Sequence, residues 1–281
     1  MIDCCTYCSS SNFVLNGHDK KRVQRYKCND CHRRFCEKGI FARMRTPKEI
    51  IMNALYLRSY TLSLREVKRV IKKLKFYKIS HVSIYKWVMK FYPKLSDIEK
   101  RKPILFTNVW HVDEKFIRVR KSKDDFAYLW VVSDSNSNII AVHVSNARDA
   151  ASAKIVLRKA RERAGFNPRV IVTDGLQGYQ SATRIFGRKV RHVVAHFEKK
   201  GIVVDKKLLL LSNNKIERIN GFFALWLHVC RGLKSFETAN VWIEFFAMHY
   251  NYLMPHGQKE VVRLEWEQIP MMIQTCRDIF A

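Results

Sequence analysis

The segment Asn108–Val119, NVWHVDEKFIRV, carries the main structural signal of the chain, because it combines the alternation of a β-strand with two consecutive carboxylates. A period of two places Asp113 and Glu114 on opposite faces of the predicted strand. A carboxylate buried in a core strand is costly unless it is paired, neutralised or bound to a metal. We therefore take Asp113 as the first candidate functional residue.

Two further acids lie at the edges of predicted elements. The run RVIVTD, residues 169–174, predicts a short buried strand that ends at Asp174, where α/β proteins place carboxylates. Glu217 lies in LSNNKIERINGFF, which predicts the first turns of a helix capped by Ser212 or Asn213. The spacings between the three acids, 61 and 43 residues, leave room for the elements that would bring them together.

Each acid also has a structural alternative. Asp113 could pair with a basic side chain, Asp174 could cap the following helix, and Glu217 could form a surface ion pair with a neighbour. Glu114 and Asp134 rank lower as functional candidates, since Glu114 faces the other side of its strand and Asp134 lies in a predicted turn.

From about Trp110 to His256 the chain resembles the DDE transposases and retroviral-type integrases, most closely the insertion-sequence transposases of bacteria and archaea related to the IS6 group. The motifs that carry this resemblance are WHVDEKFIRV, VIVTDG, NNKIERINGFF and RGLKSFETAN…FFAMHYNYLMPH. The resemblance implies that Asp113, Asp174 and Glu217 hold two Mg²⁺ or Mn²⁺ ions for DNA strand cleavage and transfer.

The expected fold is an α/β RNase H-like catalytic domain, a mixed five-stranded sheet with flanking helices, preceded by a zinc ribbon and a helix-turn-helix domain. Periodicity predicts strands at residues 109–120, 126–133, 139–145, 169–174 and 189–195, and helices at 149–164, 177–186 and 236–253 and around Glu217. The expected domains are the ribbon at 1–40, the helix-turn-helix at 45–95, a linker at 96–107, the catalytic domain at 108–256 and a tail at 257–281.

Two cysteine pairs, each with two intervening residues and separated from one another by 19 residues, form a zinc signature. The four residues are Cys5, Cys8, Cys28 and Cys31. Cys4 could replace Cys5, and Cys36 or His32 could compete for the ion. Short strands at 13–15 and 24–27 around a turn at Asn16–Gly17 predict a ribbon that needs one structural Zn²⁺ to fold.

Residues 47–93 predict three basic helices, at 48–58, 64–74 and 81–91. They are a helix-turn-helix candidate, with a generic three-helix unit as the alternative. The third helix would present four residues to DNA: Ser80, His81, Ser83 and Lys86. Lys215 and Arg218, which flank the third acid, and Arg231 further along the chain are additional candidate phosphate contacts.

Composition favours a polyanionic partner. The 281 residues carry 52 Lys and Arg against 25 Asp and Glu, a net charge of +27, and residues 1–106 alone hold 25 basic and 8 acidic side chains. This excess favours nucleic acid over a membrane. There is no apolar run long enough to span a bilayer and no secretory signal, so we expect a prokaryotic cytoplasmic, nucleoid-associated protein.

The expected function is a transposase that binds the terminal inverted repeats of its own element in double-stranded DNA. Because two ends must be joined, we expect a homodimer or a higher synaptic oligomer. The alternatives are a catalytically inactive DNA-binding regulator and an RNase H-like nuclease or resolvase.

Overall fold

The computed structural model describes residues 4–8, 10–20, 22–36, 41, 44–74, 77–101, 104–120, 126–195, 200–204, 207–230 and 233–253. The chain divides into two compact units, residues 1–52 and 53–281, so the division falls inside helix α1 (Lys48–Ser59). The predicted tail at 257–281 lies outside the described residues.

The first unit contains a small antiparallel sheet of the order β1-β2-β3, formed by Phe13–His18, Gln24–Cys28 and Arg34–Cys36. Phe13, Tyr26 and Phe35 pack around the cysteines. We expected the hairpin to turn at Asn16–Gly17, and this expectation was wrong. The pairing shifts register there, because Gly17 adopts a φ of +65° inside a bulge, and the strand continues to His18.

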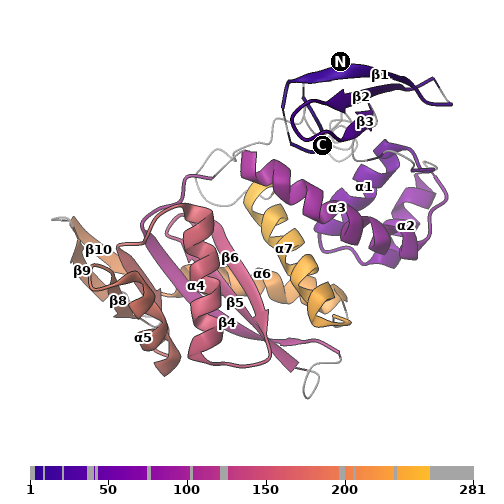
Figure 1. Ribbon diagram of the computed structural model, residues 1–281. Coiled ribbons are helices and arrows are strands. Elements are labelled where there is room, and N and C mark those ends of the chain that lie inside the picture. Colours follow the sequence, from indigo (N-terminus) through magenta and orange to yellow (C-terminus); the bar gives the residue numbers. More distant parts are fainter. Residues whose placement is uncertain are drawn as a thin grey trace. The chain divides into compact units, whose positions relative to one another are not determined.

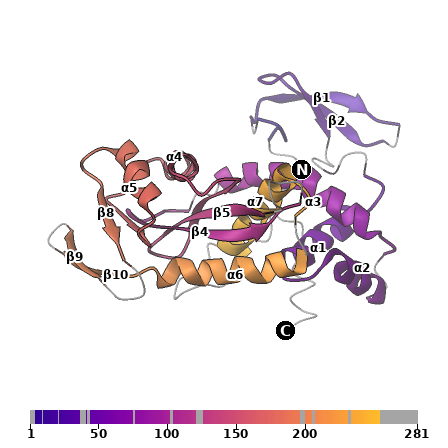
Figure 2. The same ribbon diagram turned by 90° about the horizontal axis from the view of Figure 1, so that it is seen from below.

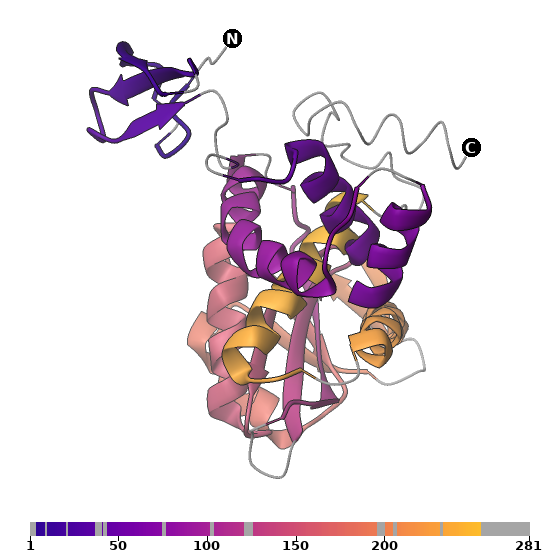
Figure 3. The same cartoon turned by 90° about the vertical axis from the view of Figure 1, so that its right-hand side faces the viewer.

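Three helices follow, α1, α2 (Leu64–Lys73) and α3 (His81–Arg101). Ser63 forms a capping box with Glu66 at the start of α2, and the Ser80 hydroxyl accepts a hydrogen bond of 2.9 Å from the Ser83 N–H at the start of α3. We expected α3 to end at Phe91, but it continues ten residues further, to Arg101. It packs along α7 (Phe236–Leu253) (Figure 3), and it does not end at Pro93.

The second unit is built on a five-stranded sheet of the order β6-β5-β4-β7-β8 (Figure 1). Its strands are β4 (Val109–Arg118), β5 (Phe126–Asp134), β6 (Ile139–Ser145), β7 (Val170–Thr173) and β8 (Arg191–Val194). The first three pair antiparallel, whereas β7 and β8 run parallel to β4. This mixed sheet is the expected RNase H-like arrangement.

Helices cover the sheet on both sides. On one face lie α4 (Ala150–Ala164) and α5 (Gln177–Thr183), and on the other lies α6 (Asn214–Cys230), as Figure 2 shows. The main core lies between the sheet and α4, and includes Trp110, Val112, Trp130, Val156 and Leu157. Helix α7 packs against the edge strand β6, where the Asn251 side chain hydrogen-bonds both backbone groups of Ile139.

One element was not predicted. An antiparallel hairpin of β9 (Lys200–Val204) and β10 (Lys207–Leu211) lies between β8 and α6. Among the described residues, no helix combines the length and the apolar character that a membrane span requires.

Candidate active site

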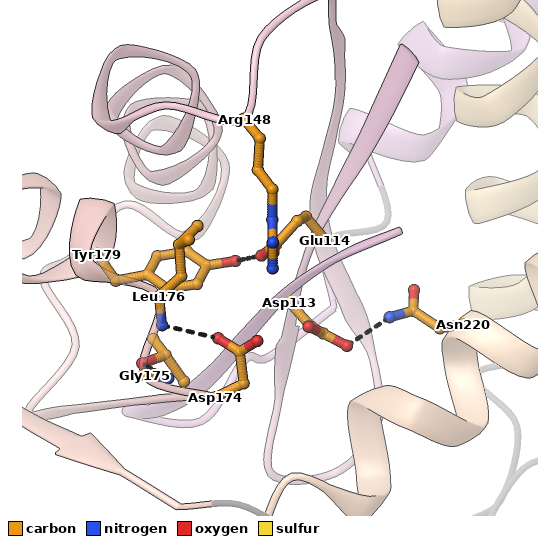
Figure 4. Close-up of polar contacts among 9 residues, drawn as sticks. Asp113, Glu114, Arg148, Asp174, Gly175, Leu176, Tyr179 and Asn220 are labelled. Atoms are coloured by element: carbon orange, nitrogen blue, oxygen red, sulfur yellow. Dashed lines mark hydrogen bonds and ion pairs between the residues drawn. The ribbon is translucent and has the colours of Figure 1, made fainter. Parts of the chain in front are cut away.

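Asp113 and Asp174 come from neighbouring strands of the sheet. Asp113 lies in β4, and Asp174 follows the last residue of β7, which pairs with β4 in parallel. Gly175 has a φ of 100°, and the chain then turns so that the Leu176 N–H donates to Asp174 Oδ1 at 3.2 Å. Carboxylate oxygens of Asp113, Glu114 and Asp174 lie within 4.8 Å of one another (Figure 4).

Helix α6 contributes to the same place. Asn220 donates through Nδ2 to Asp113 Oδ2 at 2.7 Å. Glu217 is half-buried and lies three residues before Asn220, so the two residues share a side of the helix. Glu217 lies outside the group of carboxylates within 4.8 Å of one another in the described part of the chain.

An apolar stripe fixes α6, as predicted, and its buried members are Ile216, Ile219, Phe223 and Trp226. A Cβ at Gly221 would meet no atom within 4 Å, whereas Asn220, one residue earlier, faces the sheet. The predicted side-chain cap is missing, because Asn213 Oδ1 is buried without a hydrogen-bond partner while the Asn213 carbonyl accepts the Glu217 N–H.

The electrostatics of the cluster favour a bound cation. Burial, and then the charges of Glu114 and Asp174, raise the pKa of Asp113 to about 7. Carboxylates are the hard oxygen ligands that Mg²⁺ and Mn²⁺ prefer, so the neighbouring Asp113 and Asp174 fit such an ion.

Glu114 points to the opposite face of β4 from Asp113, as predicted, yet its carboxylate reaches the cluster. Arg148 donates through Nε to Glu114 Oε1 at 2.6 Å and forms an ion pair with it through Nη2. The Tyr179 hydroxyl donates to Glu114 Oε2. The sequence alone did not indicate Arg148 or Tyr179. Arg148 precedes the residue that caps α4, and Tyr179 is an aromatic residue in the short helix α5, and neither position has a recognisable sequence pattern.

Asp134 has the structural role expected of it. It is fully buried at the end of β5 and accepts hydrogen bonds from the backbone N–H groups of Thr107, Asn136 and Asn138. Its carboxylate therefore stabilises the turn between β5 and β6.

The predicted DNA contacts lie in separate places. Lys215 and Arg218 are exposed on the first turns of α6, where the Lys215 ammonium donates to the Ser135 carbonyl at 2.5 Å. On α3, Lys86 is exposed, His81 and Ser83 are half-exposed, and the Ser80 hydroxyl caps the helix. Arg231 lies outside the described residues.

In the first unit, four sulfurs converge within 4.8 Å of one another, those of Cys5, Cys8, Cys28 and Cys31. The Cys5–Cys31 and Cys8–Cys28 sulfurs are 3.7 and 3.5 Å apart, close to the roughly 3.8 Å edge of a tetrahedron with Zn–S bonds of about 2.3 Å. The Tyr7 N–H donates to the Cys5 sulfur, and the Cys31 N–H to the Cys28 sulfur, which suits thiolates bound to a metal. Cys4 and Cys36 are not part of this cluster.

The chain is similar in sequence to transposases of insertion sequences. The chain is 28% identical over 129 residues to the transposase for the insertion sequence-like element IS431mec of Staphylococcus aureus (strain N315), an alignment that covers 45% of this chain and 55% of that protein. It is 27% identical over 129 residues to the transposase of insertion sequence element IS257 in transposon Tn4003 of Staphylococcus aureus, with the same coverage. The chain thus spans about half the length of these relatives.

Solved structures similar to this one include the HTLV-2 integrase catalytic core domain in complex with magnesium, with a TM-score of 0.39 and 17% identity over 56% of this chain and 93% of that chain. The catalytic core domain of BIV integrase gives a TM-score of 0.37 and 11% identity over 62% of this chain and 99% of that chain.

The family model of the IS240-type transposase DDE domain matches residues 107–254, which is more than half of the chain. The chain therefore belongs to the DDE transposases of the insertion-sequence group related to IS6.

Proposed function

We propose that this chain is a transposase that binds the terminal inverted repeats of its own insertion sequence and catalyses metal-dependent cleavage and transfer of DNA strands. The observation that carries the proposal is the convergence of Asp113 and Asp174 from neighbouring parallel strands, with α6 packed against them. Membership of the DDE family supports the same activity.

The residues that hold the metal are Asp113, Asp174 and Glu217. Asp113 lies beside Asp174 and accepts a hydrogen bond from Asn220 of α6, so it would be the ligand shared by the metal ions. Asn220 fixes the rotamer of Asp113, and the Leu176 N–H fixes that of Asp174. Glu217 completes the site from the exposed end of α6.

When bound, two divalent ions lower the pKa of the attacking water or 3′-hydroxyl and neutralise the departing 3′ oxygen. The protein groups hold the carboxylates in place, and none of them needs to act as a general base. Burial and the neighbouring negative charges raise the pKa of Asp113 to about 7. Bound cations would offset this cost of the charged carboxylate.

DNA is held by two other parts of the chain. The zinc ribbon and the helix-turn-helix formed by α1–α3 read the terminal repeat, with Ser80, His81, Ser83 and Lys86 at the start of α3 nearest the bases. Lys215, Arg218 and Arg231 contact phosphates beside the carboxylates. Since two ends are joined, the active form is a homodimer or a higher synaptic oligomer on double-stranded DNA.

The test is strand transfer by the purified protein on labelled duplex DNA that carries the terminal repeat, with Mg²⁺ or Mn²⁺ and with chelator. We expect joined products that depend on the metal and disappear in Asp113→Asn, Asp174→Asn and Glu217→Gln, while binding to the repeat is retained. Glu237→Gln on α7, another acid in the first turn of a helix, is the matched control and should remain active.

Specific binding without metal-dependent cleavage would instead indicate a regulator. Cleavage of branched or hybrid substrates regardless of the terminal sequence would indicate a nuclease or resolvase. Strand transfer that survives the loss of Glu217 would show that the third ligand lies elsewhere.

A further inference from the structure

Beside the two aspartates, the fold builds a second polar group that the proposed chemistry does not use. Its members are Glu114, Arg148 and Tyr179. The Glu114 side chain is only 2% exposed, and both of its oxygens are engaged, Oε1 by Arg148 and Oε2 by the Tyr179 hydroxyl. Asp113 and Asp174 differ from it, because the hydrogen bonds that orient them come from neutral amides.

Several local features hold Arg148 and Tyr179 against Glu114. Arg148 immediately precedes Asp149, whose side chain caps α4 by accepting the Ser152 N–H at 2.8 Å. Helix α5 approaches the start of α4 so closely that a Cβ on Gly178 would lie 3.2 Å from the Ala150 nitrogen. This approach brings Tyr179, which is fully buried, to the same carboxylate as Arg148 (Figure 4).

The charge of Glu114 is thus paired directly with a guanidinium, whereas Asp113 and Asp174 form no ion pair within the part of the chain that the structure describes. A buried carboxylate in a forked contact with a guanidinium is a poor metal ligand, because binding a metal would require breaking that contact. Glu114 therefore acts as an anchor for Arg148.

Arg148 itself faces outward. Its side chain remains 47% exposed although Glu114 engages the Nε and Nη2 side of the guanidinium. Within the described part of the chain, it is the cation in ion-pair contact with the carboxylate cluster. A DNA strand that approaches three carboxylates is repelled, and a pre-oriented guanidinium offers its remaining N–H donors to a phosphate.

We propose that Arg148, held in place by Glu114 and Tyr179, binds a phosphate of the DNA strand beside the metal site, and that Glu114 is a positioning residue rather than a metal ligand. This inference rests on the proposed function for the identity of its ligand, DNA. Glu114 acts through Arg148. Replacing Glu114 should therefore weaken DNA binding and leave metal binding unchanged.

The first test is the salt dependence of binding to a labelled duplex with the terminal repeat, measured on the full zinc-loaded chain without added Mg²⁺ or Mn²⁺ so that the DNA is bound but not cut. A phosphate contact contributes about 0.9 to the slope of log affinity against log salt concentration. Arg148→Ala should lower the slope by this amount. Arg161→Ala, at the other end of α4, is the matched control and should leave it unchanged. An unchanged slope in Arg148→Ala overturns the phosphate contact.

Arg148→Lys separates charge from geometry. It keeps the positive charge but cannot make the forked contact, so the salt slope should be retained while kcat/KM for strand transfer falls about tenfold to a hundredfold. This variant also decides the matter if Arg148→Ala, which leaves a buried carboxylate unpaired, fails to fold. Full activity of Arg148→Lys would overturn the positioning role.

The second test is Mn²⁺ binding by the protein without DNA. Glu114→Gln should bind Mn²⁺ with nearly the wild-type affinity, whereas Asp113→Asn should lose it. Equal loss in both variants would make Glu114 a ligand and overturn the proposal. If the wild-type protein shows no strand transfer, the proposed function fails, yet the salt slopes and the Mn²⁺ titration still decide this inference.

Discussion

At the scale of single residues, Asp113 and Glu114 show how two consecutive acids acquire different environments. The strand period sends Asp113 toward α6 and Glu114 toward α4 and α5. Asp113 meets a neutral amide there, and Glu114 meets a guanidinium. The unbalanced charge therefore resides on the aspartate side of β4, where a cation is expected.

The raised pKa of Asp113 predicts an unusual pH dependence of stability in protein to which no Mg²⁺ or Mn²⁺ has been added. Asp113 titrates near 3.9 in an unfolded chain and at about 7 in the folded protein. Between these values the folded state holds a proton that the unfolded state has released. The free energy of unfolding therefore falls as pH rises through this window, by up to about 1.4 kcal/mol per pH unit.

Urea unfolding at about pH 5 and about pH 7.5, with zinc retained, measures this effect. The difference between wild type and Asp113→Asn isolates the contribution of Asp113 together with its coupling to Glu114 and Asp174, since groups outside the cluster titrate equally in both. Added Mn²⁺ should restore the stability of wild type at the higher pH. The same pH dependence in both proteins would show that Asp113 does not hold the proton.

The sequence predicted Asp113 and Asp174 because each lies in or at the end of a strongly apolar strand. It did not predict Asn220. Helical periodicity identifies the apolar positions that are buried, but it does not show which polar residue contacts a particular strand. Neighbouring helix positions differ by about 100° in direction, so Asn220 faces the sheet while a Cβ at the next residue, Gly221, would meet no atom. Arg148 and Tyr179 depend on the approach of α5 to α4, which only the tertiary structure reveals.

At the scale of elements, long periodic segments were predicted best. Helix α7 has the predicted bounds, Phe236–Leu253, and it buries Trp242, Phe245, Phe246, Tyr250 and Tyr252. The hairpin β9–β10 was missed because its strands, KGIVV and KLLLL, do not alternate and no Gly or Pro marks the turn. Helix α3 was predicted too short, since it was expected to end at Phe91 and continues to Arg101.

The attachment of α1 to the catalytic part depends on a buried cation. Arg58 is 2% exposed, lies 4.5 Å from the Trp242 ring centre and 5.0 Å from that of Phe246, and donates to the Cys230 sulfur at 2.9 Å. Arg58→Ala should lower the free energy of unfolding by about 2–3 kcal/mol, because it removes both the packing of the stem and the cation–π contacts.

Arg58→Met is the matched variant for this prediction. It keeps an unbranched apolar stem between the two rings and avoids burying a charge, so most of the stability should be retained. Chemical denaturation of the two variants and wild type gives the comparison. A loss in Arg58→Met as large as that in Arg58→Ala would show that the charge, rather than the packing, holds α1 in place.

At the scale of the whole molecule, the two units differ in what stabilises them. The second unit buries a large apolar core between its sheet and helices. In the ribbon of the first unit, the described core is a small cluster of aromatic residues around the cysteines, too little to fold by itself. Stability in the first unit should therefore depend on zinc, and stability in the second should not.

This difference predicts two separable unfolding events. Cys28→Ser should abolish zinc binding and unfold the first unit, because a ligand bound only by the folded state contributes its binding energy to folding. The thermal transition of the second unit should not change. Affinity for the terminal repeat should fall, since the ribbon is one of the two proposed DNA-reading elements.

Zinc content, the amide signals of the ribbon and calorimetry of the full chain measure these effects together. Cys36→Ser and Cys4→Ser are the matched controls, because both residues lie in the first unit but outside the cluster of four sulfurs. Each control should retain one zinc ion and a folded ribbon. Loss of zinc in Cys4→Ser but not in Cys5→Ser would show that Cys4, rather than Cys5, is the zinc ligand. A lower transition temperature of the second unit in Cys28→Ser would show that the two units depend on each other for stability.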